Sequence, residues 1–235
     1  MRSKHIAGVV LFVGLCAGGS GASARGGEFY YEMIFGSQNS PKQFKYSHTW
    51  ATFIRVVGEG PDVNTYAIEA HTISWMPKSL DVKVLSRRPE PGVNLDLYQT
   101  LAVVGGQGQS VTMWGPFITR KELYDRSLEV LKIMASGAPE YRAISTQRDL
   151  LISDCIHAVA AVDSVFGRRH SPLIRIGKPA SRYIARQVMT RSLLDQTLSD
   201  NAWLVPRLGL DRYPIEVVAP SQIPKRGCVL CKGPD

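Results

Sequence analysis

The prediction of the fold begins with residues 46–75, YSHTWATFIRVVGEGPDVNTYAIEAHTISW. From 46 to 57 every second residue, starting with His48, is aromatic or β-branched, which is typical of a strand with one face on a core. Residues 64–75 alternate in a similar way and carry His71, and the glycines and proline between the two segments are typical of a turn. We predict two neighbouring strands, a hairpin, in which antiparallel pairing sets the two histidines side by side.

Weaker strand signals lie on both sides of this hairpin. Short runs rich in apolar and β-branched residues occur at 29–35, 82–85, 100–104, 110–114 and 212–218. Beyond residue 118 the pattern becomes helical. One helix is predicted between a capping box formed by Thr119 with Glu122 and a stop at Gly137. A second is predicted over about 154–166 with Ser153 as its N-cap, and a third starts near Pro179 with arginines on its polar side.

Strands followed by helices predict an α+β fold, an antiparallel sheet packed on helices. We expect one such domain over 25–219, preceded by an export signal at 1–24 and followed by a Pro- and Gly-rich tail at 220–235. The tail holds Cys228 and Cys231, which supply at most two of the four ligands of a structural zinc site. A local disulfide is therefore favoured over a metal or redox role, and no cofactor or metal is predicted.

The export signal has three parts: a basic start, an apolar run at 6–15 and the small residues Ala22-Ser23-Ala24 before the expected cleavage. This run of ten residues is about half of the roughly 20 that a membrane span needs. We expect an exported protein of the periplasm, envelope or medium, without a transmembrane span after cleavage. Export by cleavage is favoured over a lipid anchor on Cys16, because the bulky Leu15 precedes that cysteine.

The chain has 28 Lys and Arg against 20 Asp and Glu, a formal charge of +8. The excess lies in residues 165–235, which hold 12 basic and 5 acidic side chains, whereas 25–164 hold 14 and 15. A basic surface attracts anionic polymers and lipid headgroups, so an anionic envelope surface is a candidate partner. Nucleic acid is disfavoured because no aromatic residues for base stacking are interleaved with the arginines. The oligomeric state stays open.

Cys155 is the one cysteine of the expected mature chain inside a predicted helix, and it falls in the first turn. Free N–H groups and the helix dipole there favour the thiolate, which is the nucleophilic form. The alternative is a small buried residue that packs the helix on the sheet. His157 lies on nearly the opposite side of this helix, so a base for the thiol has to come from elsewhere. His48 and His71 are the candidates, and with Cys155 they would form a triad.

The order of these features resembles a known family. A strand opening with histidine (SHTWATFIR), a strand with a second polar residue (YAIEAHTISW), a helix, and a cysteine at a helix start (SDCIHAV) are similar to the circularly permuted NlpC/P60 branch of the papain-like cysteine hydrolases. The resemblance covers roughly residues 44–166. It implies Cys155 as nucleophile, His48 as base and His71 as the third residue, with Glu69 as the substitute.

The resemblance also implies an activity. Members cleave amide, ester or thioester bonds of peptides, cell-wall peptides or lipids through an acyl-cysteine intermediate. This chain departs from the pattern at two positions: Asp154 stands where such families often have Asn, and Ser47 where they often have Gly. The negative charge of Asp154 opposes ionisation of the neighbouring thiol. A catalytically inactive envelope-associated protein that binds through its basic C-terminal surface is therefore the alternative function.

Overall fold

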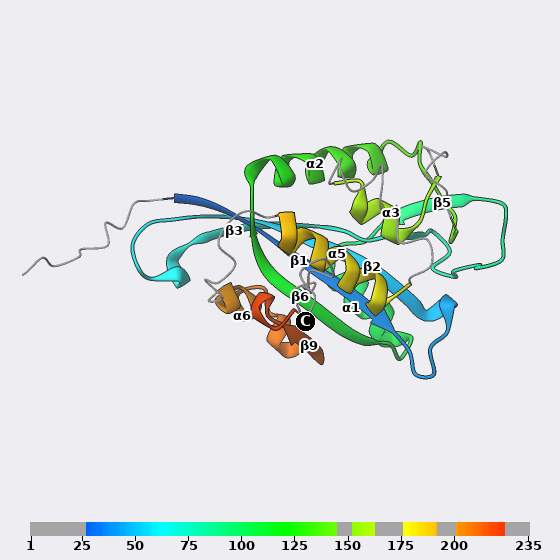
Figure 1. Cartoon of the computed structure of the whole chain (residues 1–235). Coiled ribbons are helices and arrows are strands. Elements are labelled where there is room, and N and C mark those ends of the chain that lie inside the picture. Colours follow the sequence, from blue (N-terminus) through cyan, green and yellow to red (C-terminus); the bar gives the residue numbers. More distant parts are fainter. Residues whose placement is uncertain (1–26, 145–151, 163–175, 192–200, 224–235) are drawn as a thin grey trace, which may run out of the picture.

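The computed structural model describes residues 27–144, 152–162, 176–191 and 201–223. The fold is α+β, as predicted, with two sheets and packed helices (Figure 1). The described strands are β1 (Gly27–Gln38), β2 (Ser47–Gly58), β3 (Ala67–Ile73), β4 (Trp75–Pro77), β5 (Glu90–Asn94), β6 (Ser110–Thr119), β7 (Glu140–Tyr141), β8 (Ile152–Ser153) and β9 (Ile215–Val218). The described helices are α1 (Leu97–Gly106), α2 (Lys121–Ala135), α3 (Cys155–Ala160), α5 (Lys178–Arg191) and α6 (Leu204–Arg207).

The larger sheet has the strand order β3-β2-β1-β6-β9, and the smaller one has the order β4-β5-β7-β8. The predicted hairpin is confirmed, because β2 pairs antiparallel with β3. Strand β1 is central and runs antiparallel to both β2 and β6. The late strand β9 lies parallel to β6, so the larger sheet is mixed.

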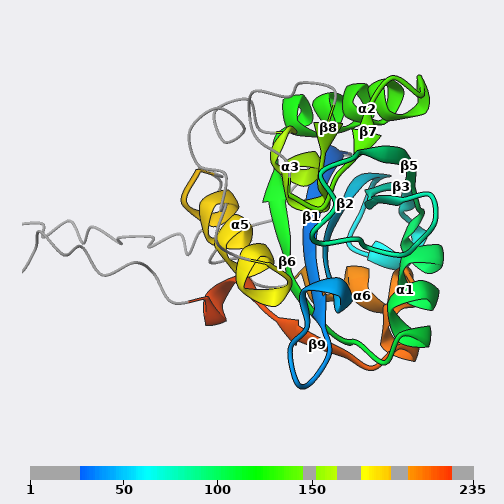
Figure 2. The ribbon, with the colours of Figure 1, turned by 90° about the vertical axis from the view of Figure 1, so that its right-hand side faces the viewer.

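Both faces of the larger sheet are covered, and Figure 2 shows it nearly edge-on between two groups of helices. On one face, Ile34, Ala51 and Phe53 belong to a core cluster shared with α2, α3 and α5. On the other face, Phe35 and Trp50 pack with residues of α1 and α6. A strand covered on both faces buries successive residues, which is why β1 is buried continuously from residue 30 to 37. Successive residues along β1, and along β2, therefore point into different cores.

Two of the predicted strands are wrong. Residues 100–104 lie in helix α1, where Asp96 and Gln99 form a capping box and Leu97, Leu101 and Val104 recur at helical spacing. Residues 82–85 lie in the loop between β4 and β5. The segment 64–75 holds two strands rather than one, because the pairing with β2 ends at Ile73 and Trp75 begins the smaller sheet.

The helix starts also differ from the prediction. Thr119 is the last residue of β6, and α2 begins after Arg120 without a side-chain cap, so the predicted capping box is absent. The N-cap of α3 is Asp154 rather than Ser153, and α3 ends at Ala160, earlier than predicted. The helix near Pro179 is confirmed as α5.

Several predictions concern segments that are not described. Residues 1–24 with Cys16, and the tail residues Cys228 and Cys231, lie outside the described residues. Within the described ranges, no helix has both the length and the apolar character needed to cross a membrane.

Candidate functional site

Cys155 is the first residue of α3, as the sequence predicts. The Asp154 carboxylate caps this helix and accepts hydrogen bonds at 2.9 Å from the backbone N–H groups of both Ile156 and His157. Its other oxygen lies 2.6 Å from Nδ1 of His157. Asp154 is thus occupied with the helix start and with His157, and it orders the turn that carries the thiol.

The thiol of Cys155 is buried, with 8% of the residue exposed, in the core cluster that contains Phe53. Burial raises the pKa of Cys155 to about 12, and the negative charge of Asp154 adds to this rise. Hydrogen bonds from backbone groups of Thr49, Ile156 and Cys155 itself lower the pKa, but by less. The free N–H groups expected at the helix start are therefore present, yet desolvation dominates and the thiol stays protonated at neutral pH.

His48 lies on β2, and its side chain is buried on the α1 side of the sheet. Its ring stacks on Trp50, and Nε2 lies 2.8 Å from the hydroxyl of Ser74. Thr100 of α1 in turn donates a hydrogen bond to Ser74 at 2.8 Å. Burial lowers the pKa of His48 to about 3. His48 is therefore a neutral imidazole that belongs to a buried hydrogen-bonded chain.

His71 lies on β3, directly opposite Phe53 of β2. Its ring packs on Phe53 and on the edge of Tyr124, and Nε2 lies 2.6 Å from the hydroxyl of Ser127 in α2. Burial lowers the pKa of His71 to about 4. This histidine joins the sheet to α2.

The structure does not bring the three predicted catalytic side chains together. His71 pairs with Phe53, which is five residues along β2 from His48, a separation of about 16 Å along a strand. Because five is odd, the two histidines also point to opposite faces of the sheet. Cys155 lies in the cluster on the Phe53 face, whereas His48 stacks on Trp50 of the other face. The expectation that His71 orients His48 is therefore wrong in this arrangement.

Glu69, the substitute for His71, is exposed and points toward solvent on β3. Its carboxylate accepts a hydrogen bond from Arg55 at 2.9 Å, and Arg55 also pairs with Glu28. Glu69 thus takes part in a surface ion-pair network, and within the described residues it forms no hydrogen bond or ion pair with Cys155 or His48.

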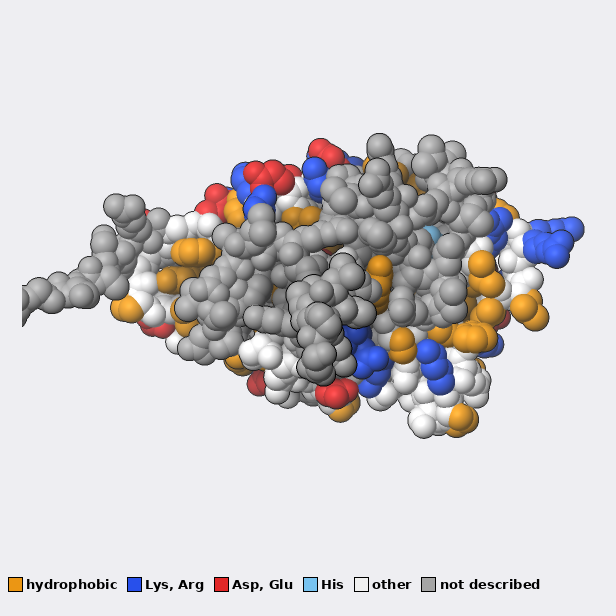
Figure 3. All heavy atoms as spheres, viewed as in Figure 1, with side chains coloured by type: hydrophobic (Ala, Val, Ile, Leu, Met, Phe, Trp, Pro, Cys, Tyr) orange, Lys and Arg blue, Asp and Glu red, His pale blue; other side chains and the backbone are white. Residues whose placement is uncertain are grey.

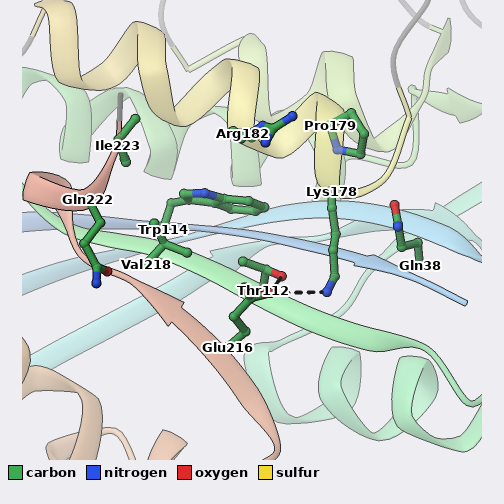
Figure 4. Close-up of a pocket in the computed structure, with 10 residues that line it drawn as sticks. All are labelled: Gln38, Thr112, Trp114, Lys178, Pro179, Arg182, Glu216, Val218, Gln222 and Ile223. Atoms are coloured by element: carbon green, nitrogen blue, oxygen red, sulfur yellow. Dashed lines mark hydrogen bonds and ion pairs between the residues drawn. The ribbon is translucent and has the colours of Figure 1, made fainter. Parts of the chain in front are cut away.

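A pocket of about 360 Å³ opens elsewhere, beneath α5 (Figure 4). Its wall on one side is the first turn and a half of α5, and the opposite side is formed by β6 and β9. The buried indole of Trp114 lies inside it, with Val218 and Ile223 beside the ring. The volume is within the range of small-molecule sites, and the pocket combines apolar and charged groups.

Two cations from the basic region 165–235 line this pocket. Lys178 and Arg182 are four residues apart, so they lie on the same side of α5. Nζ of Lys178 lies 3.6 Å from Glu216, which also accepts a 2.6 Å hydrogen bond from the Thr112 hydroxyl. Those two contacts lower the pKa of Glu216. Arg182 is exposed and forms no ion pair with another described residue, so one cation of the pocket is uncompensated.

Gln38, at the end of β1, adds a polar group to the same pocket. Its buried Oε1 atom has no hydrogen-bond partner within the described part of the chain. Such an atom is usually paired, with protein or with another molecule. Sequence reasoning placed arginines on the polar side of this helix, of which Arg182 is one, but it missed Gln38, Trp114 and Glu216. No local pattern carries that information, because the pocket forms only when β9 pairs with β6, about one hundred residues apart in the chain.

No group of three or more His, Cys, Asp or Glu side chains in the described ranges is arranged to hold a metal ion. Comparison of the chain with models of known protein families, with curated proteins and with solved structures finds no match. The geometry of the two regions described above is therefore the basis for any functional conclusion.

Proposed function

We propose that this chain is a binding protein that holds a small anionic ligand in the pocket beneath α5, and that Cys155 has a packing role. The observation that carries the proposal is that Arg182, which has no ion-pair partner among the described residues, and the Trp114 indole line the same pocket. This proposal sharpens the alternative function considered from the sequence, since both cations belong to the basic C-terminal third.

The chemistry of the lining defines the ligand class. A guanidinium donates paired hydrogen bonds to a carboxylate or phosphate, and Arg182 has no carboxylate partner among the described residues. The Trp114 indole extends below Arg182, and together with Val218 and Ile223 it forms an apolar wall against which the edge of a planar or sugar ring can pack (Figure 4). The ligand that fits is a phosphate or carboxylate attached to a ring, with Gln38 available for a further hydrogen bond.

Isothermal titration of the full chain with 1-naphthyl phosphate tests this proposal. We expect saturable binding, and about tenfold weaker binding by Arg182→Gln because a charge-assisted hydrogen bond is lost. Arg126→Gln is the matched control, since Arg126 is also an exposed helical arginine but lies in α2, outside the pocket. Absence of binding by the unaltered chain, or equal affinities of the chain and Arg182→Gln, would contradict the proposal.

A cysteine hydrolase of the permuted NlpC/P60 type is the second candidate, and one observation favours it. Backbone groups of Thr49, Ile156 and Cys155 hydrogen bond to the sulfur, and such donors would also stabilise the oxyanion of an acyl-transfer reaction. In that reaction the thiol proton would go to His48, and the Cys155 thiolate would attack the acyl carbon. The bond from that carbon to the leaving group would break, the leaving group would take the proton from His48, and water would then hydrolyse the acyl-cysteine. His48 would first have to leave Ser74 and reach the other face of the sheet.

Iodoacetamide labelling, followed at the Cys155 peptide by mass spectrometry, separates the two candidates. A hydrolase requires fast labelling near neutral pH that is lost in His48→Ala, because the imidazole would activate the thiol. If Cys155 only packs α3 on the sheet, the unaltered chain should be labelled slowly, and the labelling rate of His48→Ala should be no lower.

A further inference from the structure

Two loops meet at one end of the molecule, at the right of Figure 1. One is the connection between β1 and β2, residues 39–46, and the other is the connection between β4 and β5, residues 78–89. An ion pair of 2.7 Å between Lys45 and Asp81 joins them. We refer to these two loops together as the cationic loop end.

The cationic loop end exposes two large hydrophobic side chains. Leu85 is 92% exposed and Phe44 is 64% exposed, more than any other large hydrophobic side chain of the described residues. Leu85 lies in a turn closed by a 3.0 Å hydrogen bond from the N–H of Ser86 to the carbonyl of Lys83. A second bond of 3.0 Å runs from the Ser86 hydroxyl to the carbonyl of Arg88. The exposure of Leu85 is therefore imposed by an ordered turn.

The two loops that carry these side chains are rich in cations. The two loops carry one acidic residue, Asp81, which is paired with Lys45, and β5 begins with a second one, Glu90. In Figure 3, Lys and Arg side chains and hydrophobic side chains gather together at this end. The six cations of the loops are Lys42, Lys45, Lys78, Lys83, Arg87 and Arg88. Besides the pair of Lys45 with Asp81, Nζ of Lys83 lies 3.8 Å from the carboxylate of Glu90.

We propose that the cationic loop end docks on an anionic lipid bilayer, with Leu85 and Phe44 inserted among the headgroups and the cations on the lipid phosphates. Lysines and arginines close to an anionic leaflet are attracted to it, and single apolar side chains on protruding loops add insertion energy. A protein partner would instead favour a broad apolar patch with satisfied polar groups. Leu85 and Phe44 are strongly exposed side chains on two different loops that also carry cations, which fits an anionic lipid surface. The proposal is independent of the pocket beneath α5.

Hydrogen exchange of the full chain gives a local readout. The chain is mixed with vesicles of phosphatidylcholine alone or with an equal part of phosphatidylglycerol. We expect slower amide exchange in residues 39–46 and 78–89 with the anionic vesicles only. This readout is unaffected by partitioning of the apolar run at 6–15, because exchange is measured at the loops themselves. Unchanged exchange in both loops would overturn the proposal.

Vesicle sedimentation of variants gives the matched comparison. Phe44→Ser/Leu85→Ser is expected to weaken the partitioning onto anionic vesicles by about tenfold, since two apolar side chains no longer insert. Phe29→Ser/Val57→Ser is the control, because both residues are exposed hydrophobics at the opposite end of β1 and β2. Equal losses in the two double variants would contradict the proposal.

Ionic strength and self-association complete the test. Raising the salt from about 50 mM to about 500 mM is expected to release the chain, because exposed charges are screened. A dimer in analytical ultracentrifugation that Phe44→Ser/Leu85→Ser abolishes, without vesicle binding, would assign the surface to a second copy of the chain and overturn the proposal.

Discussion

The start of α3 and the pocket beneath α5 lie on the same face of the larger sheet, yet they differ in solvent access. At the start of α3, Cys155 and Asp154 are buried and their polar atoms are held by backbone groups and His157. In the pocket, Arg182 is exposed and faces a cavity. Residue types with intrinsic reactivity are thus enclosed, whereas an ordinary arginine is available to a ligand.

In both regions the environment of a side chain decides its reactivity more than its residue type does. A cysteine at a helix start becomes reactive only when the helix dipole and its donors outweigh desolvation. Here burial has the larger effect and raises the pKa of Cys155. His48 shows the same balance, since burial lowers its pKa and favours the neutral ring bonded to Ser74.

The largest expected effect concerns the thiol. At pH 8 the native chain should alkylate at Cys155 about a thousandfold more slowly than the urea-unfolded chain, because a pKa of about 12 instead of 9 reduces the thiolate fraction by about that factor. The measurement is the iodoacetamide rate at the Cys155 peptide in each state. Similar rates in the two states would mean that the start of α3 is as open as the pocket.

The next effect concerns the buried chain behind His48. Ser74→Ala removes the partner of both His48 and Thr100, and it should lower the free energy of unfolding by about 2 kcal/mol. Urea denaturation at pH 7 measures this change. Ser136→Ala is the control, since the Ser136 hydroxyl is exposed and makes only local hydrogen bonds, to the carbonyl of Ile133 and from the N–H of Ala138. Equal small changes in both variants would argue that His48 is not held by this chain.

The stability should also depend on pH in a defined direction. The pKa of His48 falls from 6.5 to about 3 on folding. Between these two values His48 binds a proton in the unfolded chain but stays neutral in the native chain. The contribution of the neutral His48 to the free energy of unfolding is therefore fully present above pH 6.5, and it is lost as the pH falls toward 3. His48→Phe should reduce this slope in thermal unfolding between pH 7 and pH 4, and an unchanged slope would contradict a buried neutral His48.

A smaller effect is expected at Asp154. Asp154→Asn keeps a side-chain oxygen for the N-cap but removes the charge that raises the pKa of Cys155. Alkylation of Cys155 at pH 8 should then be about tenfold faster, with little change in stability. Asp154→Ala is the comparison, because it also removes the cap and should lower the free energy of unfolding by about 1 kcal/mol. A slower rate in Asp154→Asn would exclude the charge effect.

The smallest expected effect tests the pocket. Glu216 pairs with Lys178, so Glu216→Gln should release this cation and tighten 1-naphthyl phosphate binding by about threefold. The amide can still accept the hydrogen bond from Thr112. Titration calorimetry measures the change, and weaker binding would place Glu216 in direct contact with the ligand rather than with Lys178.

The sequence predicted the faces of β2 correctly but not the register that decides the triad. Alternation places His48 and Trp50 on one face, and it identifies His71 as a strand residue, because both patterns are local. The pairing of His71 with Phe53 depends on where β3 begins after the turn, which composition does not specify. The same limit applies to Ser74, Thr100 and Gln38, whose partners or pocket neighbours are distant in the chain.

We propose that the pocket beneath α5, and not Cys155, carries the function. The most direct measurement compares the affinities of Cys155→Ala and Arg182→Gln for 1-naphthyl phosphate in one series of titrations. We predict that Cys155→Ala binds like the unaltered chain and that Arg182→Gln binds about tenfold more weakly. Loss of binding in Cys155→Ala with full binding in Arg182→Gln would contradict the account.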